Sequence, residues 1–192
     1  MVYIIGIDHL LQYNGPVPEY LLEEFRNFLS ARIIEFNISV IAEEFNEEFL
    51  FEVLGATEAT AKIVAGKSGV DHIFCDPEEH ERKVLGIPYY ADVRECVKLK
   101  YGIKENFIFD NALRKKVHEE TAAEVKKYWA VRERFWFDRI KERLAENILF
   151  LCGHEHVTSF RDYLEENGIE VCIVDEFWRR EIFSDYGKLG LR

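Results

Sequence analysis

The sequence predicts a single α/β domain with a largely parallel or mixed central sheet of about five or six strands flanked by helices. Short apolar runs alternate with helical stretches along the chain, and this order favours parallel strands joined by right-handed crossovers. The 192 residues are enough to bury one sizeable core, and no low-complexity linker divides them. We therefore expect residues 1–192 to form one domain, with a loosely ordered tail after about residue 180.

The first half of the chain supplies three of the expected strands. Apolar residues from Leu21 to Phe36 recur at helical spacing, and Pro18 suits the first turn of that helix. Gly66 or Gly69 would end the next helix. In order, the expected elements are a strand at 2–7, a helix at 18–36, a strand at 39–42, a helix at 57–66 and a strand at 70–75.

The second half supplies two more strands after a long helical region. The signal between residues 78 and 102 is mixed, with helical turns at 78–85 and a helix at 93–101, and an edge strand near Ile87 or Ile108 would be the sixth. The remaining elements are a helical stretch from about 110 to 146 with room for one break, a strand at 147–152, a helix at 158–167 and a strand at 169–174.

Composition and charge exclude several classes of protein. The formal net charge of −11 argues against a broad nucleic-acid-binding face, which needs a basic surface. It does not exclude a nuclease that holds phosphate through metal ions. There is no run of about 18 apolar residues, so we expect no membrane span, and residues 2–7 are too short for a signal peptide. The expected ligand is a small-molecule or peptide substrate.

The four cysteines indicate a reducing compartment. None of them forms a Cys-x-x-Cys pair, and three lie in or beside apolar runs that look like buried strands. Buried free thiols are typical of proteins in a reduced cytoplasm. We therefore expect the protein to be cytoplasmic.

Two copies of a short pattern, Gly-x-x-His, lie at opposite ends of the chain, each directly after an apolar run. The first is Gly6-Ile7-Asp8-His9 and the second is Gly153-His154-Glu155-His156. Ligands of open α/β sheets bind at the carboxyl ends of the strands, so we expect His9 and His156 to meet in a site assembled by folding. Each glycine would allow a sharp turn or a close approach of backbone.

Every expected strand ends in an acid, a histidine or both. These residues are Asp8 and His9, Glu43 and Glu44, Asp76, His154 to His156, and Asp175 and Glu176. Any one of the acids alone could be a helix cap or a solvated loop residue. Together they predict a site in which His9, Glu43 or Glu44, and His156 bind a divalent metal ion such as Mn, Zn or Co, or act directly as acid and base.

Three further residues are candidates for substrate binding. Arg134 lies on a predicted helix before the fourth strand, where its guanidinium would bind a carboxylate or phosphate oxygen; a surface ion pair with a neighbouring acid is the alternative. Arg82 follows the loop of the third strand and is a second basic candidate. Asp76 is an acidic candidate, although an acid before Pro77 also favours a turn.

This layout resembles that of the TraB/PrgY/GumN proteins and the Tiki proteases, whose superfamily includes erythromycin esterase-like and ChaN-like haem-uptake proteins. The two Gly-x-x-His segments match the family's first and late motifs, and Glu43 or Glu44 matches its acidic residue after the second strand. Arg134 lies where the family carries an arginine, while residues 78–127 match no part of it. The resemblance implies a metal-assisted or Glu/His-assisted hydrolytic site and no particular substrate.

Three functions follow as expectations. In the first, the protein is a hydrolase whose catalytic residues are His9, Glu43 or Glu44, and His156, with Arg134 holding a substrate oxyanion. In the second, the same site binds haem or a small polar ligand without turnover. In the third, the protein is an interaction or regulatory protein in which these residues are structural. The sequence contains neither a phosphate-binding glycine loop nor a Gly-x-Ser-x-Gly turn, so nucleotide binding through such a loop and serine hydrolysis are not supported.

Overall fold

The computed structural model describes residues 1–13, 17–104, 108 and 110–183. The chain forms two compact units, residues 1–78 together with 133–192, and residues 79–132. Within the tail expected to be loosely ordered, residues 180–183 form a helical turn in which Phe183 is fully buried. The rest of that tail, residues 184–192, lies outside the described residues.

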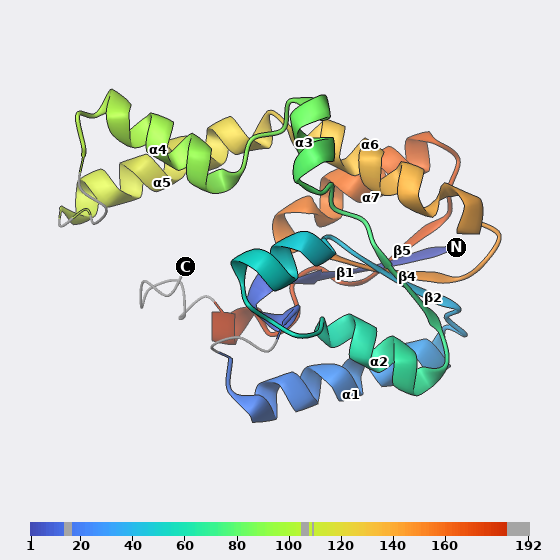
Figure 1. The fold of residues 1–192 in the computed structure, drawn as a ribbon. Helices are drawn as coiled ribbons and strands as arrows, with labels where there is room; N and C mark the ends of the chain where they lie inside the picture. Colours follow the sequence, from blue (N-terminus) through green and yellow to red (C-terminus); the bar gives the residue numbers. More distant parts are fainter. Residues whose placement is uncertain (14–16, 105–107, 109, 184–192) are drawn as a thin grey trace. The chain divides into compact units, whose positions relative to one another are not determined.

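The first unit is built on a sheet of five parallel strands, which confirms the α/β fold predicted from the sequence (Figure 1). The strands lie side by side in the order β3-β2-β4-β1-β5. They are β1(Val2–Ile7), β2(Val40–Glu43), β3(Asp71–Phe74), β4(Ile148–Gly153) and β5(Val171–Asp175). Among the described residues this sheet has no sixth strand, and neither Ile87 nor Ile108 lies in one.

The central strands β1 and β4 are unbroken apolar runs because helices cover both faces of the sheet. All six residues of β4 are buried. Successive side chains of a strand point to opposite faces, so Ile5 and Leu149 pack on one face while Ile4 and Phe150 pack on the other. The edge strands β3 and β5 are mostly half-buried.

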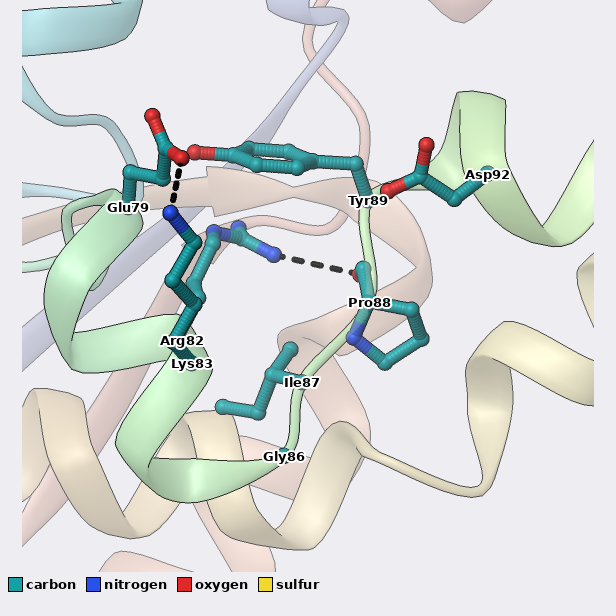
Figure 2. Close-up of a pocket in the computed structure, with 8 residues that line it drawn as sticks. All are labelled: Glu79, Arg82, Lys83, Gly86, Ile87, Pro88, Tyr89 and Asp92. Carbon is teal, nitrogen blue, oxygen red and sulfur yellow. Dashed lines mark hydrogen bonds and ion pairs between the residues drawn. The ribbon is translucent and has the colours of Figure 1, made fainter.

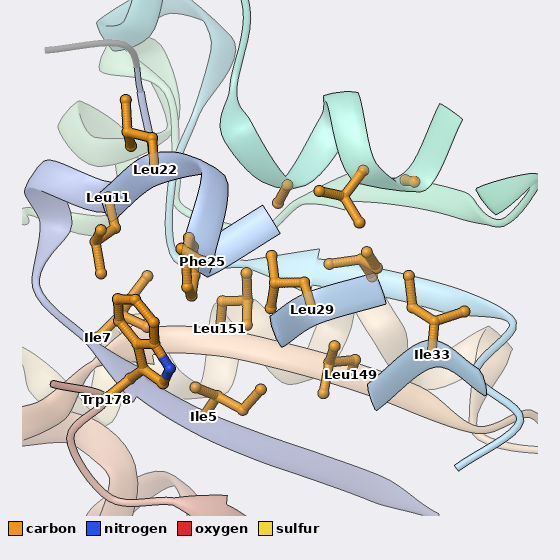
Figure 3. Packing of buried hydrophobic residues seen from close by; sticks show 14 of the residues in the cluster. Ile5, Ile7, Leu11, Leu22, Phe25, Leu29, Ile33, Leu149, Leu151 and Trp178 are labelled. Carbon is orange, nitrogen blue, oxygen red and sulfur yellow. The ribbon is translucent and has the colours of Figure 1, made fainter. Parts of the chain in front are cut away.

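One face of the sheet is covered by α1(Glu19–Glu35) and α2(Thr60–Ser68) (Figure 1). Figure 3 shows their apolar cluster, which includes Leu22, Phe25, Leu29 and Ile33 from α1, Ile5 and Ile7 from β1, Leu149 and Leu151 from β4, and Trp178. Helix α2 ends at Gly69, whose φ of 68° lies in the left-handed region that favours glycine.

The opposite face is covered by α7(Val157–Glu166) and by the part of α6(Trp129–Ile140) that begins at residue 133 (Figure 1). The side chains packed there include Trp136 and Ile140 from α6, Phe160 and Leu164 from α7, and Phe150 from β4. Both helices therefore present one apolar stripe at helical spacing to the sheet.

The second unit is helical and contains α3(Glu79–Leu85), α4(Tyr90–Lys100) and α5(Asn111–Lys126). Helices α4 and α5 lie side by side (Figure 1) and enclose a small cluster of Val97, Ile103, Ile108 and Val117. The Asp110 carboxylate caps α5 by accepting hydrogen bonds from its first backbone N–H groups. The helical stretch expected from about 110 to 146 is thus α5, α6 and a 3₁₀ turn at Lys141–Arg143.

Short helical turns follow three of the five strands. They are a 3₁₀ turn at His9–Leu11 after β1, a π-helical turn at Phe49–Val53 after β2 and a 3₁₀ turn at His154–His156 after β4. Two of these turns carry the histidines of the Gly-x-x-His segments, so local backbone structure places both imidazoles at the carboxyl edge of the sheet.

The described part of the chain contains no helix with the length and apolar character needed to cross a membrane. All four cysteines are free thiols, of which Cys75 and Cys152 are buried and Cys96 is exposed.

Candidate functional site at the carboxyl edge of the sheet

Strands β1 and β4 are neighbours, and the chain leaves them in opposite directions. It crosses from β1 to β2 on one side and from β4 to β5 on the other. The point between such strands, at their carboxyl ends, is where open α/β sheets form a crevice for ligands. Each Gly-x-x-His segment begins in the last residues of one of these two strands and continues into the turn after it, so the pattern lies on both sides of this point.

His9 begins the 3₁₀ turn after β1. The Asp8 carboxylate caps this turn by accepting a hydrogen bond from the Leu10 N–H at 3.1 Å. Residues three apart are eclipsed in a 3₁₀ turn, and the turn accordingly brings Gln12 beside His9, with 2.6 Å between His9 Nδ1 and Gln12 Oε1. The His9 side chain is 53% exposed.

His156 ends the corresponding turn after β4 and is almost fully buried. Its Nδ1 lies 2.8 Å from Oε1 of Glu133 on α6. The Ser159 hydroxyl donates a hydrogen bond to the same oxygen at 2.6 Å, and the Trp136 ring packs against the imidazole with centroids 4.9 Å apart. The carboxylate and the indole thus hold the His156 ring in one orientation, and the Ser159 hydroxyl holds the carboxylate.

Glu44 lies between the two histidines. Its Oε1 is 3.9 Å from His9 Nε2 and 3.7 Å from His156 Nε2. Its Oε2 accepts a hydrogen bond from the Gly153 N–H at 2.7 Å, while its own backbone N–H donates to the Leu151 carbonyl. The structure therefore brings together three residues that the sequence placed at the ends of three different strands.

The glycine of each pattern makes room for a close approach. A Cβ atom at Gly153 would lie 2.7 Å from His9 Nε2, so the His9 ring occupies the space above this glycine. A Cβ atom at Gly6 would lie 2.0 Å from the Glu176 carbonyl oxygen, where the segment after β5 crosses β1. That crossing is fixed by the Trp178 N–H, which donates to the Gly6 carbonyl at 2.8 Å.

Glu43 is fully buried, and its carboxylate contacts His72 and Gln12. Its Oε1 lies 2.7 Å from His72 Nε2, and its Oε2 accepts a hydrogen bond from Gln12 Nε2 at 2.9 Å. The metal set proposed from the sequence paired His9 and His156 with either glutamate. The structure places Glu44, not Glu43, between them.

The carboxyl edge of the sheet is rich in buried acidic side chains. Buried carboxyl groups come from Glu43, Glu44, Asp76 and Glu133. Burial raises the pKa of the Cys75 thiol, and the neighbouring Glu43 charge raises it further. Burial and then the Asp8 charge likewise raise the pKa of Tyr13.

Two of the substrate-binding candidates lie in the first unit. Asp76 is buried, and its Oδ1 accepts a hydrogen bond from the Trp136 indole N–H at 3.2 Å. Arg134 is exposed on α6, whereas its neighbour Glu133 points into the protein with Trp136 and Ile140. Glu133 is thus the residue of this helix that contacts a site histidine.

The third candidate, Arg82, belongs to the second unit. It lines a cavity of about 320 Å³ together with Lys83, Ile87 and Tyr89 (Figure 2). Its guanidinium lies over the Tyr89 ring, 4.8 Å from the centroid, and donates a hydrogen bond to the Pro88 carbonyl at 3.4 Å. Stacking and hydrogen bonding give Arg82 a local structural role in this unit.

Four residues of the site were missed as site residues by sequence reasoning: Gln12, His72, Glu133 and Ser159. Three of them carried a readable signal. Gln12 and Ser159 each lie three residues after the histidine of a Gly-x-x-His segment. Glu133 shares one helical face with Trp136 and Ile140, at spacings of three and seven residues.

The imidazoles of His9 and His156 and the carboxylate of Glu44 can act as bases or acids, or as metal ligands. Two imidazole Nε2 atoms and one carboxylate oxygen are donors that suit Mn, Zn or Co. The ligand atoms of His9, Glu44 and His156 do not all lie within 4.8 Å of one another. Binding one ion would therefore require the half-exposed His9 ring to move toward His156.

No protein-family model, no curated protein and no solved structure matches this chain.

Proposed function

We propose that the protein is a hydrolase whose reactive groups are His9, Glu44 and His156, acting on an ester, peptide or phosphoester bond of a small-molecule or peptide substrate. One observation carries the proposal. The Nε2 atoms of two histidines from opposite ends of the chain approach the same buried carboxylate oxygen, at 3.9 and 3.7 Å. This convergence occurs at the point of the sheet where α/β proteins bind ligands.

The two histidines have different roles in this proposal. His9 is half exposed, so its Nε2 is the base that water and substrate can reach. It accepts a proton from water as the resulting hydroxide attacks the carbonyl carbon or phosphorus, and it then gives this proton to the leaving group. His156 is buried and held by Glu133, so its role is to keep a fixed imidazole beside Glu44, opposite His9.

Glu44 stabilises the imidazolium that forms on His9 during this transfer. Its Oε1 faces His9 Nε2, and its Oε2 is fixed by the Gly153 N–H. A preorganised carboxylate in a desolvated site acts more strongly on a nearby charge than the same group does in water.

A divalent ion is the cofactor that suits these donor atoms, once the His9 ring has moved toward His156. Bound by the two imidazoles and the Glu44 carboxylate, Mn, Zn or Co would act as a Lewis acid and lower the pKa of a bound water. Carboxylate support of a ligating imidazole through its other ring nitrogen is common at metal sites, and Glu133 provides such support to His156.

The resemblance to the TraB/PrgY/GumN and Tiki proteins is part of this proposal. It rests on the two Gly-x-x-His segments and on the acid after the second strand, and Glu44 is the acid that faces both histidines. Free cysteines are compatible with a cytoplasmic location, which we include in the proposal.

The proposal is tested by assaying the purified protein against aryl esters, peptides and aryl phosphodiesters, with and without added Mn, Zn or Co. We expect His9→Ala and Glu44→Gln to lower the turnover of any substrate by about 100-fold or more. His154→Ala is the matched control, because this histidine of the same segment stacks on Phe177 with ring centroids 3.8 Å apart. Its turnover should stay within about threefold of wild type.

Two outcomes would contradict the proposal. If His9→Ala and His156→Ala leave hydrolysis unchanged, the site is not catalytic. If no substrate is turned over while haem or a metal ion raises the melting temperature of the wild type but not of His156→Ala, the same edge is a binding module.

A further inference from the structure

We propose that Gln12 is a positioning residue that fixes the imidazole tautomer of His9, with the proton on Nδ1 and the lone pair on Nε2 facing Glu44. This inference rests on the proposed function only in treating His9 as the reactive base. The assignment of the tautomer follows from hydrogen bonds alone.

The orientation of the Gln12 amide is set by two acceptors. Gln12 Nε2 donates to Glu43 Oε2 at 2.9 Å and to the Glu44 carbonyl oxygen at 3.2 Å. A carbonyl oxygen and an ionised carboxylate can only accept hydrogen bonds. Turning the amide over would place its oxygen against both acceptors, and a buried polar atom without a partner is costly. The NH₂ group therefore faces the two glutamates.

The amide oxygen must then be the atom that faces His9. Gln12 Oε1 lies 2.6 Å from His9 Nδ1. An amide oxygen has no proton to give, so the hydrogen bond requires a proton on Nδ1. A neutral imidazole carries only one ring proton, and this leaves the lone pair of His9 on Nε2, 3.9 Å from Glu44 Oε1.

Gln12 is rigid although His9 is half exposed. It is the only glutamine of the chain and only 1% exposed. Its backbone N–H donates to the His9 carbonyl, and its backbone carbonyl accepts from the Thr60 N–H at 2.9 Å. Glu43, which holds its amide, is itself held by His72 at 2.7 Å. A buried chain of hydrogen bonds thus ends on a solvent-accessible imidazole and prepares it as a base.

The test is an NMR measurement of the His9 tautomer on ¹⁵N-labelled protein, at a pH where the ring is neutral. Long-range ¹H–¹⁵N spectra distinguish a protonated ring nitrogen from one that carries a lone pair, and His9→Asn identifies the His9 signals. We expect wild-type His9 to carry its proton on Nδ1. Free histidine side chains in water favour the proton on Nε2, so this result would not arise without a fixed partner.

Variants then assign the effect to Gln12. Gln12→Met keeps the length of the side chain but not its hydrogen bonds, and we expect His9 to change to the Nε2–H form. Asn46→Leu is the matched control, because it removes another buried amide, bonded to the Pro77 carbonyl and the Phe49 N–H, that touches no imidazole. It should leave the His9 tautomer unchanged.

The inference and the proposed function fail in different ways. A wild-type His9 with its proton on Nε2, or a tautomer unaltered in Gln12→Met, overturns the role of Gln12 whatever the activity of the protein. The expected tautomer change in a protein without hydrolytic activity supports the role of Gln12 and contradicts the hydrolase. Where hydrolysis is found, Gln12→Met should lower kcat by about 10–100-fold with little change in KM.

Discussion

The two Gly-x-x-His segments share a pattern and a destination but not an environment. Each begins at the end of a central strand, continues into a 3₁₀ turn and places an imidazole Nε2 near Glu44 Oε1. His156 is 6% exposed and its Nδ1 faces the Glu133 carboxylate, whereas His9 is 53% exposed and its Nδ1 faces the amide oxygen of Gln12. The His156 ring is thus enclosed and held by a carboxylate, whereas the His9 ring is open to solvent.

This difference shows what a short pattern can and cannot encode. The strand, the glycine and the turn decide where each histidine goes, because parallel strands deliver their carboxyl ends to one edge. The partner of each Nδ1 comes from outside the four-residue pattern, from α6 for His156 and from the end of the 3₁₀ turn for His9. Two copies of one pattern therefore give two histidines with distinct roles.

The largest difference in stability between the two segments should appear when the glycine of each is replaced by alanine. In Gly6→Ala the new Cβ would meet the backbone carbonyl of Glu176 at 2.0 Å, so β1 or the segment after β5 must shift. We expect the free energy of unfolding to fall by about 3 kcal/mol or more. Urea denaturation followed by circular dichroism would measure it.

Gly153→Ala is the matched variant, and its main effect should be on the site. The new Cβ would meet only the end of the His9 side chain closely, at 2.7 Å, and this half-exposed ring can swing away. Unfolding free energy should change by about 1 kcal/mol or less, while displacement of His9 from Glu44 should lower turnover about 100-fold. Equal destabilisation by the two variants would contradict this comparison.

The next largest effect should come from the partner that immobilises His156. Glu133→Ala leaves the His156 Nδ1 and the Ser159 hydroxyl without their shared acceptor in a buried place. We expect a loss of about 2–3 kcal/mol in unfolding free energy. Ser159→Ala removes one donor and leaves the Glu133–His156 contact intact, so it should cost about 1 kcal/mol. A Ser159→Ala variant as unstable as Glu133→Ala would mean that the carboxylate does not hold the histidine.

Much of the fold could be read from the sequence because the buried strands are continuous apolar runs. The strand expected at 2–7 is found unchanged, and the others are displaced by one or two residues. The displacement at β2 is instructive. This strand continues to Glu43, which pairs in register with Phe74 and Leu151. A buried carboxylate is stable there because Gln12 and His72 form hydrogen bonds with it. Both partners are distant in sequence, so the local sequence pattern does not predict them.

The candidate site was partly predictable for the same reason. His9, Glu44 and His156 stand directly after strands, so parallel topology alone places them together. Arg134 was predicted to bind a substrate oxyanion because it lies beside the packed face of α6. The helical phase instead turns Glu133 inward and leaves Arg134 exposed. The role of Gln12 depends on a single 3₁₀ turn, which the residues from His9 to Leu11 do not distinguish from an ordinary loop.

A smaller effect is expected on the pH dependence of stability, where buried Cys75 should differ from exposed Cys96. Burial and then the Glu43 charge raise the pKa of Cys75 in the folded protein. Its contribution to stability is therefore complete below the pKa of an unfolded thiol, about 8.5, and is lost as pH rises above it. Between pH 9 and 10, the unfolding free energy of wild type should fall about 1 kcal/mol more than that of Cys75→Ala.

Cys96→Ala is the control for this measurement, because Cys96 is exposed on α4. Its unfolding free energy should follow wild type over the same pH range. Denaturant titrations at each pH provide the slopes. A Cys75→Ala variant whose slope equals that of wild type would show that the edge near Glu43 is better solvated than the structure indicates.

The smallest effect is expected at Arg134, which lies next to Glu133 in sequence but on the exposed side of α6. Arg134→Ala should change unfolding free energy by less than about 0.5 kcal/mol, as for most surface positions. If it binds a substrate oxyanion, as the sequence predicts, KM for anionic substrates should rise about fivefold and the rise should shrink at high salt, because exposed charges are screened. Arg161→Ala removes a partly exposed arginine from α7, where it pairs with Asp162 at 2.6 Å, and is the control for a general loss of positive charge. An unchanged KM in Arg134→Ala would assign substrate recognition to the inward groups around Glu44, and a rise in both variants would reduce the role of Arg134 to its net charge.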